Sequence, residues 1–107
     1  MLQYQIDVNR TRNRSLTQQE ELANYTLGLV CEAGEFGDMI KKTVYHGHAF
    51  DSLSAEKELG DVLWYLANIC NILGLDMERI MSLNLDKLTA RYPEGFSKAD
   101  SIARRDT

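Results

Sequence analysis

The stretch that decides the fold is residues 17–45, TQQEELANYTLGLVCEAGEFGDMIKKTVY. It opens on Thr17-Gln18-Gln19-Glu20, the pattern of a capping box, in which the first and fourth residues satisfy each other's backbone at a helix start. Apolar residues then recur at spacings of three and four, namely Leu22, Tyr25, Leu29, Ala33, Phe36 and Ile40. This spacing predicts one apolar stripe on a long helix that ends near Tyr45, before Gly47.

Three further helices are predicted around this one. Ser54 is a candidate N-cap for a second periodic run that stops at Gly74, a residue suited to a left-handed cap. Asp76 is the candidate cap of a third run, which stops before Pro93. Near the start of the chain, residues 4–12 predict a short, partly docked helical arm. Residues 97–107 are polar and charged, and we expect a loose tail there.

The composition favours an all-α fold in a single domain spanning residues 1–107. The chain has 107 residues with only one proline and seven glycines, too few turn residues for a sandwich or a barrel. No apolar run is long enough to span a membrane, and the first residues lack the pattern of a signal peptide, so a cytoplasmic location is expected. Both cysteines, Cys31 and Cys70, fall inside apolar-periodic segments and are predicted to be buried thiols.

The charge is unevenly distributed along the chain. The net charge is −4, and residues 20–61 contain nine acidic but only three basic side chains. A protein that binds nucleic acid through its phosphates needs a basic face, so we expect no nucleic-acid partner, and no membrane partner either. A concentration of carboxylates instead favours divalent cations.

Acidic pairs border the apolar stripes of the two central helices. Glu32 and Glu35 lie three residues apart on the first helix, and Glu58 and Asp61 repeat this spacing on the second. The short connection favours antiparallel packing, which would bring the four carboxylates into one pocket. Their mutual repulsion would be relieved by Mg²⁺, a cation that prefers carboxylate oxygens, with Mn²⁺ as a substitute. Alternatively, each pair is a solvated helix face, because an E-x-x-E pattern is common by chance.

The spacing of these motifs resembles a known family. Glu32-x-x-Glu35, 22 intervening residues and Glu58-x-x-Asp61 look like the all-α nucleoside triphosphate pyrophosphohydrolases of the MazG type. The resemblance covers roughly residues 4–96. It includes Tyr4-Gln5, Gly28-Leu29-Val30, Gly60-Asp61-Val62-Leu63-Trp64 and Asn84-x-x-Lys87-Leu88-x-x-Arg91-Tyr92-Pro93.

The resemblance implies hydrolysis of a (d)NTP between its α- and β-phosphates, giving a nucleoside monophosphate and pyrophosphate, in the service of nucleotide-pool housecleaning. It also implies that Glu32, Glu35, Glu58 and Asp61 are the catalytic and metal-binding residues, with Glu32 or Glu35 orienting the attacking water. Related dUTP or dCTP pyrophosphatases and phosphoribosyl-ATP pyrophosphohydrolase are alternatives within the enzyme class. Outside it, the alternative is a non-catalytic helical oligomerisation module.

Four residues are candidates for binding substrate. Lys87 and Arg91 lie one turn apart and would supply cations for the phosphate tail, although basic residues at a helix end are also commonly just solvated. Asn84 belongs to the same motif in the resemblance. Tyr65 falls between Glu58 and Asp61 on the helical wheel and would touch the base or sugar, the alternative being plain packing.

Two departures from the family bear on the number of metal ions. Many members have adjacent glutamates at the start of the first motif, where this chain has Cys31. Members also often carry a lysine and a further acid ahead of the second motif, where this chain has Ser54 and Lys57. The alternative to the family's full set of metal ions is therefore a smaller number of ions in this chain.

A homo-oligomer, dimer or tetramer, is expected on two grounds. Trp64 and Ala67 fall outside the apolar arc that the predicted protomer core uses, so a partner would have to cover them. The resemblance also implies a MazG-like helical bundle that is completed by oligomerisation, with a nucleotide pocket that includes residues of a neighbour.

Overall fold

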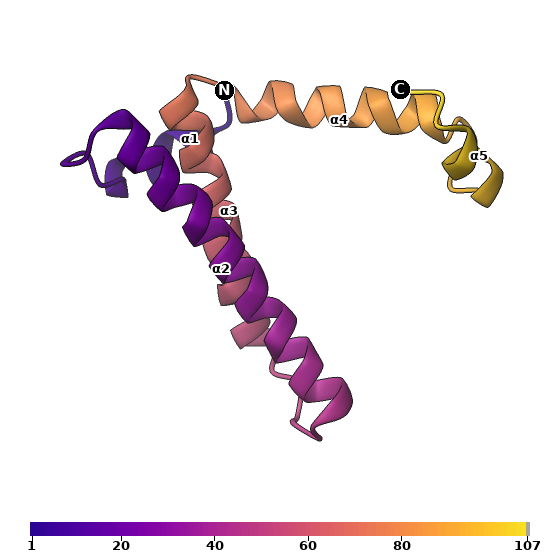
Figure 1. Cartoon of the computed structure of the whole chain (residues 1–107), viewed down its shortest axis with the longest axis horizontal. Helices are drawn as coiled ribbons and strands as arrows, with labels where there is room; N and C mark the ends of the chain where they lie inside the picture. Colours follow the sequence, from indigo (N-terminus) through magenta and orange to yellow (C-terminus); the bar gives the residue numbers. More distant parts are fainter. Residues whose placement is uncertain (107) are drawn as a thin grey trace.

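The computed structural model describes residues 1–106 and is built from helices alone, with no strand among those residues. Helix α2 (Gln18–Tyr45) and helix α3 (Ser52–Leu73) pack side by side and run in opposite directions (Figure 1). Helix α1 (Gln3–Val8) packs on α3 and continues into the short 3₁₀ helix η1 (Asn9–Thr11). Helix α4 (Met77–Arg91) projects away from the α2–α3 pair and carries α5 (Lys98–Ala103) at its far end. The all-α prediction is confirmed.

Three predicted helix ends are confirmed, and one is displaced. The capping box of α2 is present, because the Glu20 backbone N–H donates to the Thr17 hydroxyl while Glu20 Oε1 accepts from the Thr17 N–H, both at 3.2 Å. Gly74 ends α3 in the left-handed region at φ 68°, and Asp76 caps α4.

The start of α3 lies three residues before the predicted one. Asp51, not Ser54, is the N-cap, since its carboxylate accepts from the backbone N–H groups of Leu53 and Ser54 at 3.1 and 3.4 Å. Ser54 instead donates its hydroxyl to Asp51 at 2.9 Å. The prediction failed here because both residue types cap helices, and the ionised one also complements the helix dipole.

The N-terminal arm is docked by buried amides. The Gln5 side chain is 1% exposed, and its amide nitrogen donates to Asn71 Oδ1 at 3.0 Å and to the Leu75 carbonyl at 2.8 Å. Its amide oxygen accepts from the Met77 N–H at 2.9 Å. Asn68, fully buried, donates to the Val8 carbonyl. Buried polar groups that are all paired hold α1 firmly at the corner between α3 and α4.

This docking corrects the burial argument for a partner. Trp64 donates from its indole nitrogen to the Thr11 hydroxyl at 2.8 Å and packs on the core, while Ala67 is fully buried. The arm covers both residues, so Trp64 is not an uncovered subunit-contact residue. Of the two cysteines, Cys70 is buried as predicted, but Cys31 is exposed.

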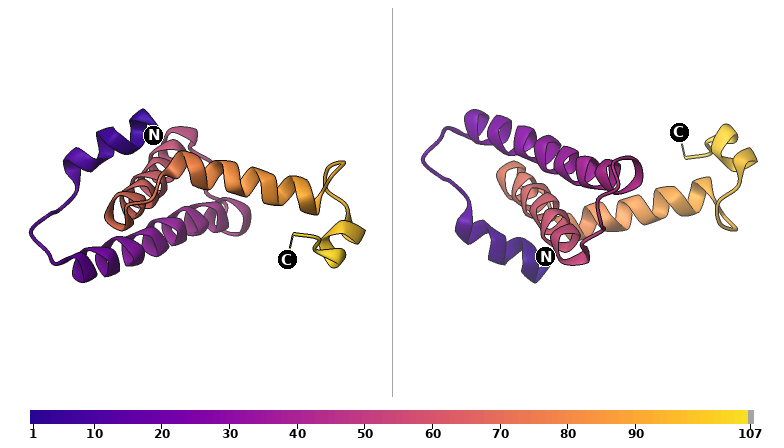
Figure 2. Two further views of the ribbon diagram at one scale, coloured as in Figure 1. Left: turned by 90° about the horizontal axis from the view of Figure 1, so that it is seen from above. Right: turned by 90° about the horizontal axis from the view of Figure 1, so that it is seen from below.

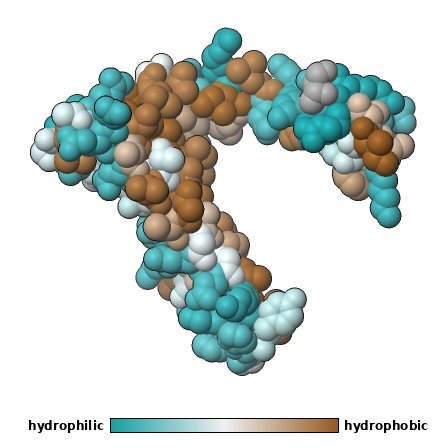
Figure 3. Space-filling view, in the orientation of Figure 1, coloured by the Kyte–Doolittle hydropathy of each residue, from teal (hydrophilic) through white to brown (hydrophobic). Residues whose placement is uncertain are grey.

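Large apolar side chains are exposed elsewhere in the protomer. Figure 2 shows from two further sides that α4 stands apart from α2 and α3. Figure 3 shows hydrophobic surface at the corner between α3 and α4 and along their inner edge. Apart from Leu53 at the start of α3, the exposed large apolar residues of these two helices are Leu59, Leu63, Leu66, Leu73, Ile80, Met81, Leu83, Leu85 and Leu88. An α3–α4 face, defined by these nine residues, is therefore left uncovered within the protomer.

The C-terminal segment differs from the expected loose tail. Ser97 caps α5 by accepting from the Asp100 N–H at 3.0 Å. Asp106 then binds the Arg91 guanidinium through two hydrogen bonds of 2.6 and 2.7 Å, a geometry that fixes both groups. Thr107 lies outside the described residues. No helix within residues 1–106 is long and apolar enough to cross a membrane.

Candidate metal and active site

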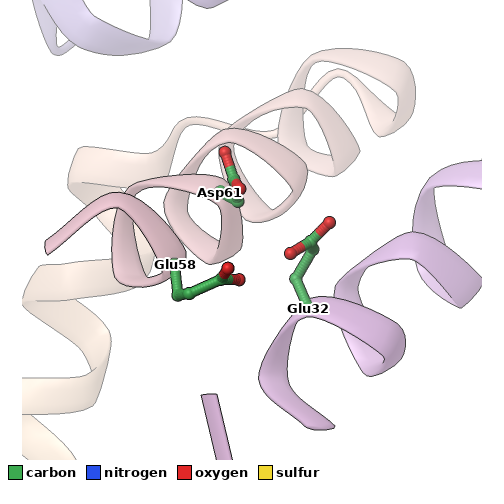
Figure 4. Close-up of side chains that lie close together, drawn as sticks. All are labelled: Glu32, Glu58 and Asp61. Carbon is green, nitrogen blue, oxygen red and sulfur yellow. The ribbon is translucent and has the colours of Figure 1, made fainter. Parts of the chain in front are cut away.

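Three of the four predicted carboxylates converge between the central helices. Glu32 extends from α2 toward Glu58 and Asp61 on α3 (Figure 4). One carboxylate oxygen from each residue lies within 4.8 Å of the other two. Glu32 and Glu58 are half-buried, and Asp61 is exposed at the edge. We refer to Glu32, Glu58 and Asp61 as the acidic cluster.

Glu35 lies beside the acidic cluster and not in it. Its side chain is exposed and lines a groove of about 290 Å³ between the end of α2 and the start of α3, together with Lys42 and His48. Its charge nevertheless acts on Glu32, as described below. The structure thus brings together three of the four predicted ligands. The fourth, Glu35, lies on α2 one turn beyond Glu32.

The carboxylates of the acidic cluster are partly buried and lie close enough to repel one another. Partial burial raises the pKa of Glu32 to about 7; the negative charges of Glu35, Asp61 and Glu58 and a hydrogen bond between protonated Glu32 and Glu58 add to this. When both carboxylates are ionised, one oxygen of Glu32 and one of Glu58, both Oε2, are buried without a hydrogen-bond partner among the described residues. A buried carboxylate oxygen without a hydrogen-bond donor costs folding free energy. A positive group between these oxygens would offset that cost.

These features fit a hard divalent cation. Carboxylate oxygens from two helices, within 4.8 Å of one another, can bind the same ion, and two of these residues have an oxygen without a partner. A cation between them would offset the repulsion that holds the pKa of Glu32 up. The acidic cluster is therefore a candidate magnesium or manganese site.

Two tyrosines border the acidic cluster. Burial raises the pKa of Tyr65, and the negative charge of Glu32 acts in the same direction. Its ring lies edge-on to that of Tyr25, with centroids 5.6 Å apart, and to that of Trp64, at 4.9 Å. Tyr4, on the N-terminal arm, likewise has a raised pKa from burial and from the charge of Asp61.

The three remaining predicted substrate residues lie on α4. Asn84 and Lys87 are exposed, and Arg91 is held by Asp106. Because α4 projects away from the α2–α3 pair (Figure 1), the protomer does not gather these residues around the acidic cluster.

Gly28 packs against Tyr65 beside the acidic cluster, a contact that the sequence analysis did not predict. A side chain at this position would collide with Tyr65, because a Cβ atom would lie 2.2 Å from Cε1 of its ring. Two signals were available: Gly28 belongs to a stretch that carries the family resemblance, and it is a glycine one turn before Glu32, within a helix where alanine would be more stable.

An antiparallel helix pair whose carboxylates converge defines a helical protein with an acidic cluster that is a candidate site for a divalent cation. Comparison with protein families identifies which one. The model of the MazG nucleotide pyrophosphohydrolase domain matches residues 19–96, well over half of the chain, and the chain belongs to this family. The match includes α2, α3 and α4, whereas the N-terminal arm lies outside it.

The chain is also similar to a curated phage protein. Gene 37 protein of Mycobacterium phage L5 is 38% identical over 82 residues, which cover 71% of this chain and 70% of the phage protein. Its name says nothing about an activity. No solved structure matches the chain significantly.

Proposed function

We propose that this protein is a Mg²⁺-dependent nucleoside triphosphate pyrophosphohydrolase that converts a (d)NTP to the monophosphate and pyrophosphate, with a cytoplasmic role in nucleotide-pool housecleaning. Membership of the MazG family supports the reaction class. The observation that carries the proposal is the acidic cluster, in which Glu32 and Glu58 each have a buried oxygen without a partner within the described chain.

Each acidic residue has a distinct part in this proposal. Glu32, Glu58 and Asp61 hold the cation, with Mn²⁺ as a substitute for Mg²⁺. When bound, the cation neutralises triphosphate charge and lowers the pKa of a bound water. Glu35 lies one turn beyond Glu32 and outside the cluster, so its carboxylate remains available to orient the water and take its proton. Glu32 is the alternative for this second task.

The phosphate tail and the base need further contacts. We assign the tail to Lys87 and Arg91, which carry the charge that β- and γ-phosphates require, and Asn84 to the same end of the substrate. Tyr65 borders the acidic cluster and offers its ring or hydroxyl to the sugar or base. Arg91 would contact phosphate with its guanidinium oriented by Asp106.

The position of α4 makes this assignment depend on a second copy of the chain. In one protomer, Lys87 projects away with α4, while the α3–α4 face is exposed over both helices. A homo-oligomer, dimer or tetramer, would cover that face and carry the α4 residues of one copy toward the acidic cluster of another.

A substrate panel tests the function and separates its rivals. The panel consists of the eight common ribo- and deoxyribonucleoside triphosphates, dUTP and phosphoribosyl-ATP, each with Mg²⁺. The common triphosphates should yield pyrophosphate and no orthophosphate. Activity confined to dUTP or dCTP would assign the protein to those specialised pyrophosphatases, and activity on phosphoribosyl-ATP alone would assign it to that hydrolase. Release of pyrophosphate from none of these substrates would favour the non-catalytic oligomerisation module.

Metal affinity should depend on pH through Glu32. Because the pKa of this carboxyl lies at about 7 without metal, protons compete with the cation below that pH. Calorimetric titration with Mn²⁺ should show affinity that rises by up to about tenfold per pH unit toward pH 7 and then levels off. The metal-free protein should lose stability over the same range, as Glu32 is forced to ionise. In Glu32→Gln, both the Mn²⁺ affinity and the stability of the metal-free protein should depend less on pH. A wild-type Mn²⁺ affinity that does not change with pH would contradict this prediction.

A further inference from the structure

Near the acidic cluster, a glycine of α2 lies against an aromatic ring of α3. A Cβ atom built on Gly28 of α2 would lie 2.2, 2.4 and 2.7 Å from the Cε1, Cζ and Cδ1 atoms of Tyr65 on α3. These distances are far below van der Waals contact, so any side chain at position 28 forces a displacement. The other glycines within α2, Gly34 and Gly37, have open space at the same position.

The Tyr65 ring has little freedom to move away. It is flanked by the rings of Tyr25 and Trp64, with centroid distances of 5.6 and 4.9 Å. Tyr25 is itself buried and its hydroxyl accepts from the Asn13 N–H at 2.7 Å, while Trp64 is held by Thr11. Because these neighbouring rings are closely packed, a displacement of the Tyr65 ring would also displace the residues around it.

This contact lies one helical turn from the acidic cluster on both helices. Gly28 is four residues before Glu32 on α2, and Tyr65 is four residues after Asp61 on α3. The separation of the helices at the contact therefore governs the distance between the carboxylate of α2 and the two carboxylates of α3. A displaced ring would either push α3 away or enter the cluster.

We propose that Gly28 is a positioning residue, which lets the Tyr65 ring seat against α2 and so sets the spacing of Glu32 from Glu58 and Asp61 for binding a divalent cation. The proposal deepens the proposed function and rests on it for the role of the cluster. It concerns a residue that contacts neither metal nor nucleotide and acts only through Tyr65.

Calorimetric titration of the purified protein with Mn²⁺ alone tests it. Gly28→Ala should weaken Mn²⁺ binding by at least about tenfold, a loss typical of disturbing the groups that orient metal ligands. Gly37→Ala is the matched control on the same helix and should leave the affinity unchanged, because its new methyl group meets open space. Unchanged Mn²⁺ affinity in Gly28→Ala, or an equal loss in Gly37→Ala, would overturn the proposal.

The ring itself is tested by a double-mutant cycle. In a Tyr65→Ala background the clash is gone, so adding Gly28→Ala should change Mn²⁺ affinity by less than about twofold. In a Tyr65→Phe background the ring remains, and the full loss should persist. A similar loss in the alanine background, or no loss in the phenylalanine background, would overturn the steric mechanism.

Two further measurements keep the test decisive. If circular dichroism shows that Tyr65→Ala does not fold, alanine and valine are substituted at position 28 and, as a control, at position 37. The loss of Mn²⁺ affinity should grow with side-chain size at position 28 only. Equal losses at the two positions would overturn the proposal. Pyrophosphate release separates the two hypotheses. A wild type that binds Mn²⁺ but hydrolyses no nucleotide refutes the proposed function alone, whereas an active wild type matched by Gly28→Ala refutes the positioning role alone.

Discussion

Glu58→Gln is expected to lower the rate of pyrophosphate release by at least about tenfold while the protein remains folded. The substitution preserves the shape of the side chain but removes its charge, and with it one of the three groups that would hold the cation. Glu32→Gln and Asp61→Asn should show losses of the same order, since all three carboxylates lie in the acidic cluster. Glu35→Gln should lose activity as well, but with less effect on Mn²⁺ affinity, because Glu35 lies outside the cluster.

Steady-state kinetics and thermal unfolding of the metal-free proteins together check this prediction. Removing one of several repelling carboxylates should leave the metal-free protein as stable as the wild type or more so. Glu56→Gln provides a matched control, because Glu56 is an exposed glutamate on α3, two residues before Glu58, and does not belong to the acidic cluster. Full activity in any two of the four variants would contradict a shared site.

The second large effect is expected at the α3–α4 face. Leu63→Glu should reduce the particle to a mass near 12.2 kDa and abolish activity, because a charge would be buried where two copies meet and the cluster would lose the neighbouring α4. Leu63 replaces Trp64 as the informative position, since Trp64 lies against the N-terminal arm within its own protomer.

Sedimentation equilibrium at micromolar concentration, paired with the activity assay, measures this effect. The control is Val44→Glu, which changes an exposed apolar residue at the C-terminal end of α2. It should change neither the mass nor the activity. A wild type of one-protomer mass with full activity would contradict the oligomer and the assignment of Lys87 and Arg91 to a neighbouring site.

Apolar spacing and cap residues were sufficient to predict the central helices. The capping box at Thr17 and the cap glycine at Gly74 depend only on local chemistry, and both are present. The docking of the arm could not be predicted in this way. It depends on Gln5, Asn68 and Asn71, polar side chains that a search for apolar stripes counts as surface. Consequently, Trp64 and Ala67 looked uncovered in the sequence, although the arm packs over both and leaves Trp64 half-buried and Ala67 fully buried.

The site shows the same division between local and tertiary information. Helical periodicity placed Glu32, Glu58 and Asp61 on facing flanks, and they do converge. It could not predict that Glu35 stays outside, since that depends on how the two helices cross. Nor could it predict that Gly28 meets Tyr65, because a glycine offers no side chain to a periodic pattern.

The most direct test of the account is a ³¹P NMR time course of a nucleoside triphosphate with Mg²⁺, run with the wild type and with Glu58→Gln. The account predicts that pyrophosphate and nucleoside monophosphate grow in equal amounts with the wild type, and at least about tenfold more slowly with the variant. Orthophosphate and nucleoside diphosphate as the products, or equal rates for the two proteins, would contradict it.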